Sequence, residues 1–169
     1  RHAKDFLADW RGTLVCDDYA GYKALFETGA VTEAGCMAHA RRKFHELWAH
    51  HKSALAEEAL KLFGALYDIE RLAADLDADG RRRLRELRSR PVADTLYEWL
   101  TLHRQRATDG TAMAKAIDYS LKRWAALTRF LSVVDGWVRW GLRSGGRSCR
   151  AGRARTRAGR CGSSPRRRC

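Results

Sequence analysis

Two adjacent carboxylates near the start of the chain are the residues best suited to chemistry. Asp17 and Asp18 directly follow residues 13–16, a β-prone apolar run of the length expected for a buried strand. A carboxylate at the carboxyl end of such a strand lies at the rim of a sheet, where α/β folds place ligands and metals. One of the two could instead only cap the helix that follows, because Asp is a preferred N-cap residue. The spacing alone favours the cap.

Thiol and imidazole side chains suggest a second kind of metal site. Cys36 and His39 have a CxxH spacing, and Cys16 could lie on a neighbouring strand. A structural zinc site takes four Cys or His ligands, however, and a fourth ligand is not evident. The ligand count therefore favours a buried thiol and a histidine at the start of a helix.

The helix predicted over residues 38–50 carries a basic polar face. His39, Arg41, Arg42 and Lys43 are its candidates for contact with DNA, because such side chains are typical phosphate ligands. A solvated helix surface explains the same charges equally well. The histidines at 50 and 51 and the arginines at 81–83 are most simply surface charge.

The spacing of apolar residues divides the chain into two parts, and the first part holds the candidate residues described above. Up to about residue 50, apolar runs of strand length alternate with helical segments, whereas later apolar residues recur every three or four positions. The pattern from Leu55 to Leu76 predicts a helix that Gly80 ends, followed by a charged segment anchored by Leu84 and Leu87. Short connections make this half an all-α bundle. The expected elements are helical segments over residues 4–10, 19–26, 38–50, 55–76, 91–106 and 113–131 and strands over residues 13–16 and 31–37.

The positive charge of the chain is concentrated at its end. The 169 residues have a net charge of +13, but residues 136–169 hold eleven Arg and no Asp, Glu or Lys. The preceding residues carry 22 basic against 20 acidic side chains and are therefore nearly neutral. No apolar run approaches the length of a membrane span, and the start lacks the apolar core of a signal peptide, so we expect a cytoplasmic location. The five irregularly spaced cysteines favour reduced thiols.

The tail over residues 132–169 lacks apolar periodicity after Leu142, which predicts disorder. An arginine arm that neutralises nucleic-acid phosphates is one interpretation. The abrupt change after Leu131 favours another, in which GC-rich DNA is translated out of frame. The chain also begins without Met, within what looks like the middle of a structural element, so we expect a piece of a longer protein.

Three segments in this order closely resemble the transposase of the bacterial insertion sequence sixty-six family. They are GTLVCDDYAGYKALF, VTEAGCMAHARRKFHEL and YSLKRWAALTRFL, and the resemblance covers about residues 1–131. It implies an RNase H-like core with a DDE metal site, interrupted by an α-helical insertion. The implied fold is an α/β fragment of that core in residues 1–50, a mainly α-helical insertion bundle in 51–131, and a disordered basic tail in 132–169.

The resemblance also implies a chemical role for Asp17. Such transposases hold two divalent metals with acidic side chains for phosphoryl transfer on DNA, and carboxylates suit Mg²⁺. Asp17 looks like the second catalytic aspartate, whereas Asp18 is secondary, because its position is often Gly in the family. Strand alternation also turns the two side chains to opposite sides, so only one is expected to face the metals. Transposon ends, target DNA and other transposase subunits are the implied partners. The other two catalytic carboxylates have no match here, so we expect the polypeptide alone neither to cleave nor to join DNA. The alternative is a non-enzymatic nucleic-acid binder acting through the Arg-rich tail.

Overall fold

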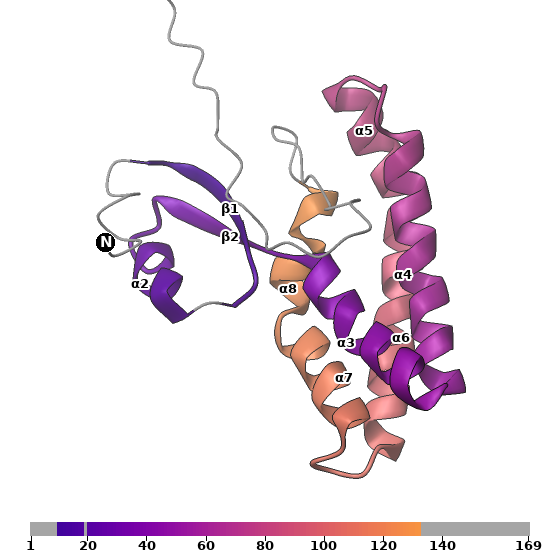
Figure 1. The fold of residues 1–169 in the computed structure, drawn as a ribbon. Coiled ribbons are helices and arrows are strands. Elements are labelled where there is room, and N and C mark those ends of the chain that lie inside the picture. The colour runs from indigo at the N-terminus through magenta and orange to yellow at the C-terminus, as the bar shows by residue number, and fades with distance from the viewer. Residues whose placement is uncertain (1–9, 19, 133–169) are drawn as a thin grey trace, which may run out of the picture.

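The computed structural model describes residues 10–18 and 20–132, in which a small pair of strands leads into a group of longer helices (Figure 1). None of the helices in these two ranges is both long and apolar enough to cross a membrane. In chain order the elements are β1 (Gly12–Cys16), η1 (Ala20–Tyr22), α2 (Lys23–Phe26), β2 (Val31–Gly35), α3 (Met37–His51), α4 (Ala54–Leu72), α5 (Ala78–Leu84), the π-helical turn η2 (Arg85–Ser89), α6 (Arg90–Arg106), α7 (Ala112–Lys122), α8 (Trp124–Leu127) and η3 (Thr128–Leu131).

The two strands are parallel and therefore end at the same edge. Their register pairs Cys16 with Gly35, and the amide of Cys36 donates to the carbonyl of Cys16 at 2.9 Å. A Cβ at position 35 would lie 3.0 Å from the backbone nitrogen of Leu127, so glycine lets the last helical segment approach the strand. The carboxyl end of the sheet thus lies beside both α3 and the end of the helical region.

Helices α3, α4, α6 and α7 surround one apolar core. Each contributes fully buried side chains, among them Phe44, Phe63, Leu96 and Ile117. The mainly helical second part expected from the apolar spacing is therefore present. Helix α3 belongs to this core through its buried face, although it begins at the sheet edge. This double placement brings the start of the basic helix next to the end of β1.

The first long helix is shorter than its apolar pattern predicted. Helix α4 ends at Leu72, and Leu76 is 39% exposed after it. Gly80 does not end that helix but lies inside α5, where its amide donates to the Asp77 side chain at 2.7 Å. Asp77 is therefore the N-cap of a separate helix, and this cap interrupts the predicted one.

The charged segment after α5 is held by an ion pair, so the prediction of leucine anchors was wrong for Leu87, which is 75% exposed. Arg85 and Ser89 are four residues apart and are buried on the same helix face, whereas Leu87 lies opposite. The Arg85 guanidinium donates to both carboxylate oxygens of Glu70 at 2.7 Å and to the carbonyl of Phe130 at 3.1 Å. This contact ties the α4–α6 hairpin to η3.

The second strand and the last helix differ from their predicted extents. The strand ends at Gly35 instead of residue 37, because Cys36 is the extended N-cap of α3. The last predicted helix is broken at Arg123, whose φ of −106° is not helical, into α7, α8 and η3. The helix expected over residues 4–10 and the tail from residue 133 lie outside the described residues.

Candidate functional site

Asp17 and Asp18 follow β1 and contact different partners. The carboxylate of Asp17 lies 3.4 Å from Nε2 of His39, whereas that of Asp18 pairs with the guanidinium of Arg123. Asp18 has a φ of +74°, a left-handed turn that separates the directions of the two side chains. Exposure does not distinguish them, since the side chains are 46% and 44% exposed. Their partners do, because an arginine neutralises the charge of Asp18 whereas Asp17 faces an imidazole.

Arg123 connects this edge to the helical bundle. Its side chain is 10% exposed, and Nη2 donates to Oε1 of Glu33 on β2 at 2.6 Å, while Nη1 pairs with Asp18. Burial alone would lower the pKa of Arg123, but the hydrogen bond to Glu33 and the charges of both carboxylates raise it overall. The guanidinium therefore stays charged and holds two of the acids at the sheet edge.

The Cys16 thiol beside these acids is buried and protonated at neutral pH. Burial raises the pKa of the Cys16 thiol to about 11, and its Sγ donates to Glu33 at 3.4 Å. A thiol that holds its proton is a poor metal ligand. Within residues 10–18 and 20–132, no group of three or more His, Cys, Asp or Glu side chains is placed to hold a metal ion. The zinc interpretation of Cys36 and His39 thus has no ligand set in this part of the chain.

His39 is neutral at pH 7. Burial lowers its pKa, and Arg42 and Lys43 lower it further, although the charge of Asp17 acts in the opposite direction. The contact between His39 and Asp17 is therefore one between an uncharged imidazole and a carboxylate. It orients Asp17 without neutralising it.

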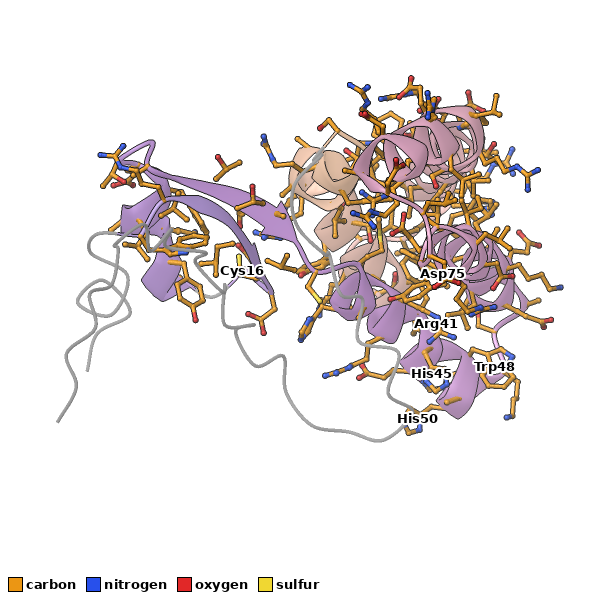
Figure 2. The ribbon with its side chains drawn as sticks, turned by 90° about the horizontal axis from the view of Figure 1, so that it is seen from above. Cys16, Arg41, His45, Trp48, His50 and Asp75 are labelled. Atoms are coloured by element: carbon orange, nitrogen blue, oxygen red, sulfur yellow. The ribbon has the colours of Figure 1, made fainter. Side chains whose placement is uncertain are left out.

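Helix α3 does not present its four candidate DNA-binding residues on one face. His39 and Lys43 are one turn apart on the side turned toward α7, where Nζ of Lys43 lies 4.5 Å from the ring centre of Tyr119. Arg41 falls on a different side, and His45 follows it one turn further along α3 (Figure 2). Arg42 is exposed. The helical period separates a basic run that is continuous in the sequence.

The sequence reasoning missed Glu33, Tyr119 and Arg123 as parts of this edge. Burial raises the pKa of Tyr119 to about 12, helped by the charges of Asp18 and Asp17 but opposed by Arg123. The hydroxyl of Tyr119 is buried and has no hydrogen-bond partner among the described residues. Two signals were available: a carboxylate within a predicted strand, and a tyrosine and an arginine four residues apart on one helix face.

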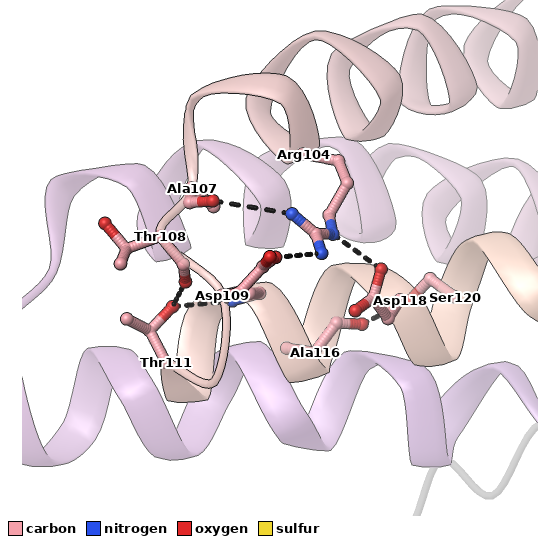
Figure 3. Close-up of polar contacts among 9 residues, drawn as sticks. Arg104, Ala107, Thr108, Asp109, Thr111, Ala116, Asp118 and Ser120 are labelled. Carbon is pink, nitrogen blue, oxygen red and sulfur yellow. Dashed lines mark hydrogen bonds and ion pairs between the residues drawn. The ribbon is translucent and has the colours of Figure 1, made fainter.

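A second polar cluster closes the turn between α6 and α7 (Figure 3). Arg104 donates to Asp118 at 2.7 Å, to Asp109 at 2.5 Å and to the carbonyl of Ala107 at 3.4 Å. These contacts use donors on all three nitrogens of the guanidinium, so the cluster stabilises the turn instead of presenting a charge for a ligand. The acidic edge at β1 is the better candidate for a functional site.

The described site has two parts, the Asp17 carboxylate and the start of the basic helix α3. No arginine or lysine of the described residues pairs with this carboxylate. It lies at the end of parallel strands, the place where α/β proteins bind ligands. The family model for "Transposase IS66 family" matches residues 1–138, and the chain belongs to this family. The resemblance found in the sequence is thereby confirmed.

Two curated relatives of similar sequence are named as uncharacterized proteins. The uncharacterized protein y4hP of Sinorhizobium fredii (strain NBRC 101917 / NGR234) is 38% identical over 153 residues, which cover 81% of this chain and 27% of that protein. The uncharacterized protein y4jD of the same strain is 35% identical over 144 residues, covering 82% of this chain and 28% of its own length. The chain thus spans little more than a quarter of these relatives. No solved structure matches the chain.

Proposed function

We propose that this chain is part of a transposase that cuts and joins DNA by metal-dependent phosphoryl transfer, and that Asp17 is one carboxylate of its DDE metal site. Membership of the transposase family supports the reaction class. The observation that supports Asp17 is the difference in pairing at the sheet edge. Arg123 holds Asp18 and Glu33, while Asp17 lies 3.4 Å from Nε2 of His39 and pairs with no arginine or lysine of the described residues. Asp17 is therefore the carboxylate of this edge best able to bind a cation.

Among the described residues, the donors at the sheet edge fit one ligand of such a site. Mg²⁺ takes hard oxygen ligands, and a two-metal site supplies the electrostatic clamp for an in-line displacement. Asp17 suits this role, whereas Asp18 and Glu33 share one guanidinium, that of Arg123, which pairs with both of them. We therefore propose that the 169-residue polypeptide does not cleave or join DNA by itself.

The division of the chain forms part of the same proposal. Residues 1–50 are a partial RNase H-like core, and residues 51–131 are the α-helical insertion. The parallel pairing of β1 with β2 and the acids at their shared end support the first assignment. DNA and further transposase subunits are the partners expected for such an enzyme. His39 and Lys43 lie on the side of α3 nearest Asp17 and are its first candidates for phosphate contact.

Paramagnetic broadening by Mn²⁺ tests the role of Asp17 without requiring catalysis. A single carboxylate binds a divalent ion weakly, so titration should broaden the amide resonances around residues 16–18 and the ring signals of His39. Asp17→Asn should remove this broadening, and the matched control Asp18→Asn should retain it. Equal effects of the two substitutions, or broadening that survives Asp17→Asn, would contradict the assignment.

Nicking of a supercoiled plasmid in Mg²⁺ or Mn²⁺ tests the proposed inactivity. We expect no nicking by the purified 169-residue chain. Nicking that is present in this chain and lost in Asp17→Asn would overturn the inactivity while supporting the role of Asp17. The same pair of proteins thus separates the two parts of the proposal.

The second candidate function, nucleic-acid binding through the Arg-rich tail, rests on the eleven arginines of residues 136–169. Those residues lie outside the described ranges. Deletion of residues 136–169 should abolish tight, salt-sensitive DNA binding if the tail is the binding element. Unchanged binding by a deletion variant with an unchanged circular dichroism spectrum would contradict this function.

A further inference from the structure

A groove of about 290 Å³ lies between α3 and α7 and is lined by basic side chains. Its described lining contains Lys43 and the neighbouring histidines 50 and 51 from α3, and Lys115 from α7. Glu46 is the acid in that lining. The groove therefore gathers two lysines and two histidines from two helices that the sequence separates by about sixty residues.

The groove lies on the same helix–helix seam as the acidic edge. Lys43 lines the groove and contacts the ring of Tyr119, which is one helical turn before Arg123. One turn before Lys43 on α3, His39 contacts Asp17. From position 50 back to position 39, α3 advances about 16 Å, at about 1.5 Å per residue. A ligand lying along this seam would reach from the groove to the carboxylate.

Neither lysine of the groove forms an ion pair with an acid of the described residues, as is also true of Lys52 at the C-cap of α3 and Lys122 at the end of α7. Lys61 on α4, by contrast, pairs with Glu57 at 3.1 Å. The acid of α7, Asp118, is not part of the groove lining and accepts from Arg104 on α6 (Figure 3). The groove side of α7 is therefore left with a net positive charge.

We propose that the α3–α7 groove binds the phosphate backbone of duplex DNA and leads it toward Asp17. The inference rests on the proposed function and adds to it the surface on which DNA lies. Lysine side chains suit this task because backbone contacts require charge and reach but no base recognition. About 16 Å corresponds to roughly five successive phosphates of one strand, which are spaced by about 3.4 Å along the duplex axis. Lys43 and Lys115 supply the positive charge along this length, and the two histidines add hydrogen-bond donors.

The salt dependence of DNA binding tests the groove in the full 169-residue chain. A fluorescent duplex of random sequence serves as the probe. Lys115→Gln should weaken binding and lower the slope of log K against log salt by about one, because one phosphate contact is lost. Lys61→Gln is the matched control, since it makes the same change at an exposed helical lysine outside the groove. It should leave both the affinity and the slope unchanged.

Lysine acetylation gives an independent readout that the tail cannot obscure, because residues 136–169 contain no lysine. Duplex DNA should protect Lys43 and Lys115 from acetylation by several-fold more than it protects Lys61. Inorganic phosphate, added at the same concentration of anionic groups, should give little protection, because it cannot occupy several sites along the seam at once. Protection by phosphate equal to that by DNA would mean a simple anion site and would overturn the inference.

Two further outcomes separate the groove from the proposed function. If DNA binds but Lys61→Gln and Lys115→Gln change the slope equally, the contact is diffuse. The groove is then refuted, and DNA remains the partner. If the unaltered chain shows no salt-sensitive binding to duplex DNA, both the groove and DNA binding by this part of the transposase are refuted. If DNA does not protect Lys43 and Lys115 from acetylation but Mn²⁺ still broadens the signals around Asp17, the groove is refuted. The proposed metal-binding role of Asp17 is then unaffected.

Discussion

Replacement of Arg123 by Met tests how much the contacts between the helical bundle and the acidic edge contribute to the stability of the fold. Methionine has a similar length and no charge, so the substitution removes the contacts to Asp18 and Glu33 while filling most of the same space. We expect lower stability of the whole fold and a local loosening of the sheet edge.

The size of the effect follows from the exposure of the partners. A hydrogen bond to a charged group contributes about 1.5–3 kcal/mol when it is buried. Asp18 and Glu33 are 44% and 28% exposed, so water compensates for much of the loss. The substitution also removes the buried Nε of Arg123, which has no partner among the described residues. Together these considerations give a destabilisation of about 1–2 kcal/mol.

Urea unfolding measures this change as a lower midpoint at an unchanged m-value. Arg42→Met is the matched control, because Arg42 is exposed on α3 and should change stability by less than about 0.5 kcal/mol. Amide hydrogen exchange adds a local test at Cys36, whose amide donates to the carbonyl at the end of β1. If Arg123→Met costs no more than Arg42→Met, or if its effect is additive with that of Glu33→Gln, the clamp does not exist as described.

Three further predictions concern the core and the sheet. Arg85→Met should cost about 3–5 kcal/mol because it leaves Glu70 buried without a cation, and the double variant with Glu70→Leu should recover most of that loss in urea unfolding. Gly35→Ala should destabilise the fold by about 1–3 kcal/mol, because the added Cβ would crowd α8. Gly64→Ala is the matched control in thermal melts. It should stabilise the fold by about 0.5–1 kcal/mol, because Gly64 lies on α4 with open space around it. Burial raises the pKa of Cys16 from 9.0 to about 11, so this thiol ionises at lower pH in the unfolded chain than in the folded one. The free energy of unfolding should therefore fall as pH rises from 9 to 11. Cys16→Ala should make this pH dependence weaker.

Local sequence patterns predicted the elements that local forces determine. The apolar run before Asp17 forms β1, and the three- and four-residue spacing after residue 50 forms helices. The spacing could not show that Asp77 would start a new helix, because the apolar pattern continues across the turn. Nor could it show that Arg85 is buried, since a buried arginine depends on an acid fifteen residues away. Such contacts are properties of the packed chain.

The candidate site was predicted in the same partial way. A carboxylate at the end of a strand is visible in the sequence, and Asp17 lies there. The partner that sets Asp18 apart from it is Arg123, 105 residues further along the chain. Strand alternation predicted only that the two acids would point to different sides, not that one would be neutralised. The role of Asp17 as a metal ligand remains a prediction.

Ion pairs are unevenly distributed over the folded part, so positive and negative side chains are separated in space. Residues 1–135 are nearly neutral in total, so an electrostatic surface can arise only where cations and acids are separated in space. Pairing within the bundle contributes to that separation, because Arg104 pairs with Asp118 outside the groove lining and Arg123 pairs with Asp18 at the sheet edge. Among residues 10–18 and 20–132, this leaves the Asp17 carboxylate at one end of the α3–α7 seam and lysines without ion pairs along it. A polyanion would be attracted by the lysines along the seam and repelled by its acids, which are Glu46 in the groove and the carboxylates at the sheet edge. At Asp17 a divalent cation would have to mediate the contact.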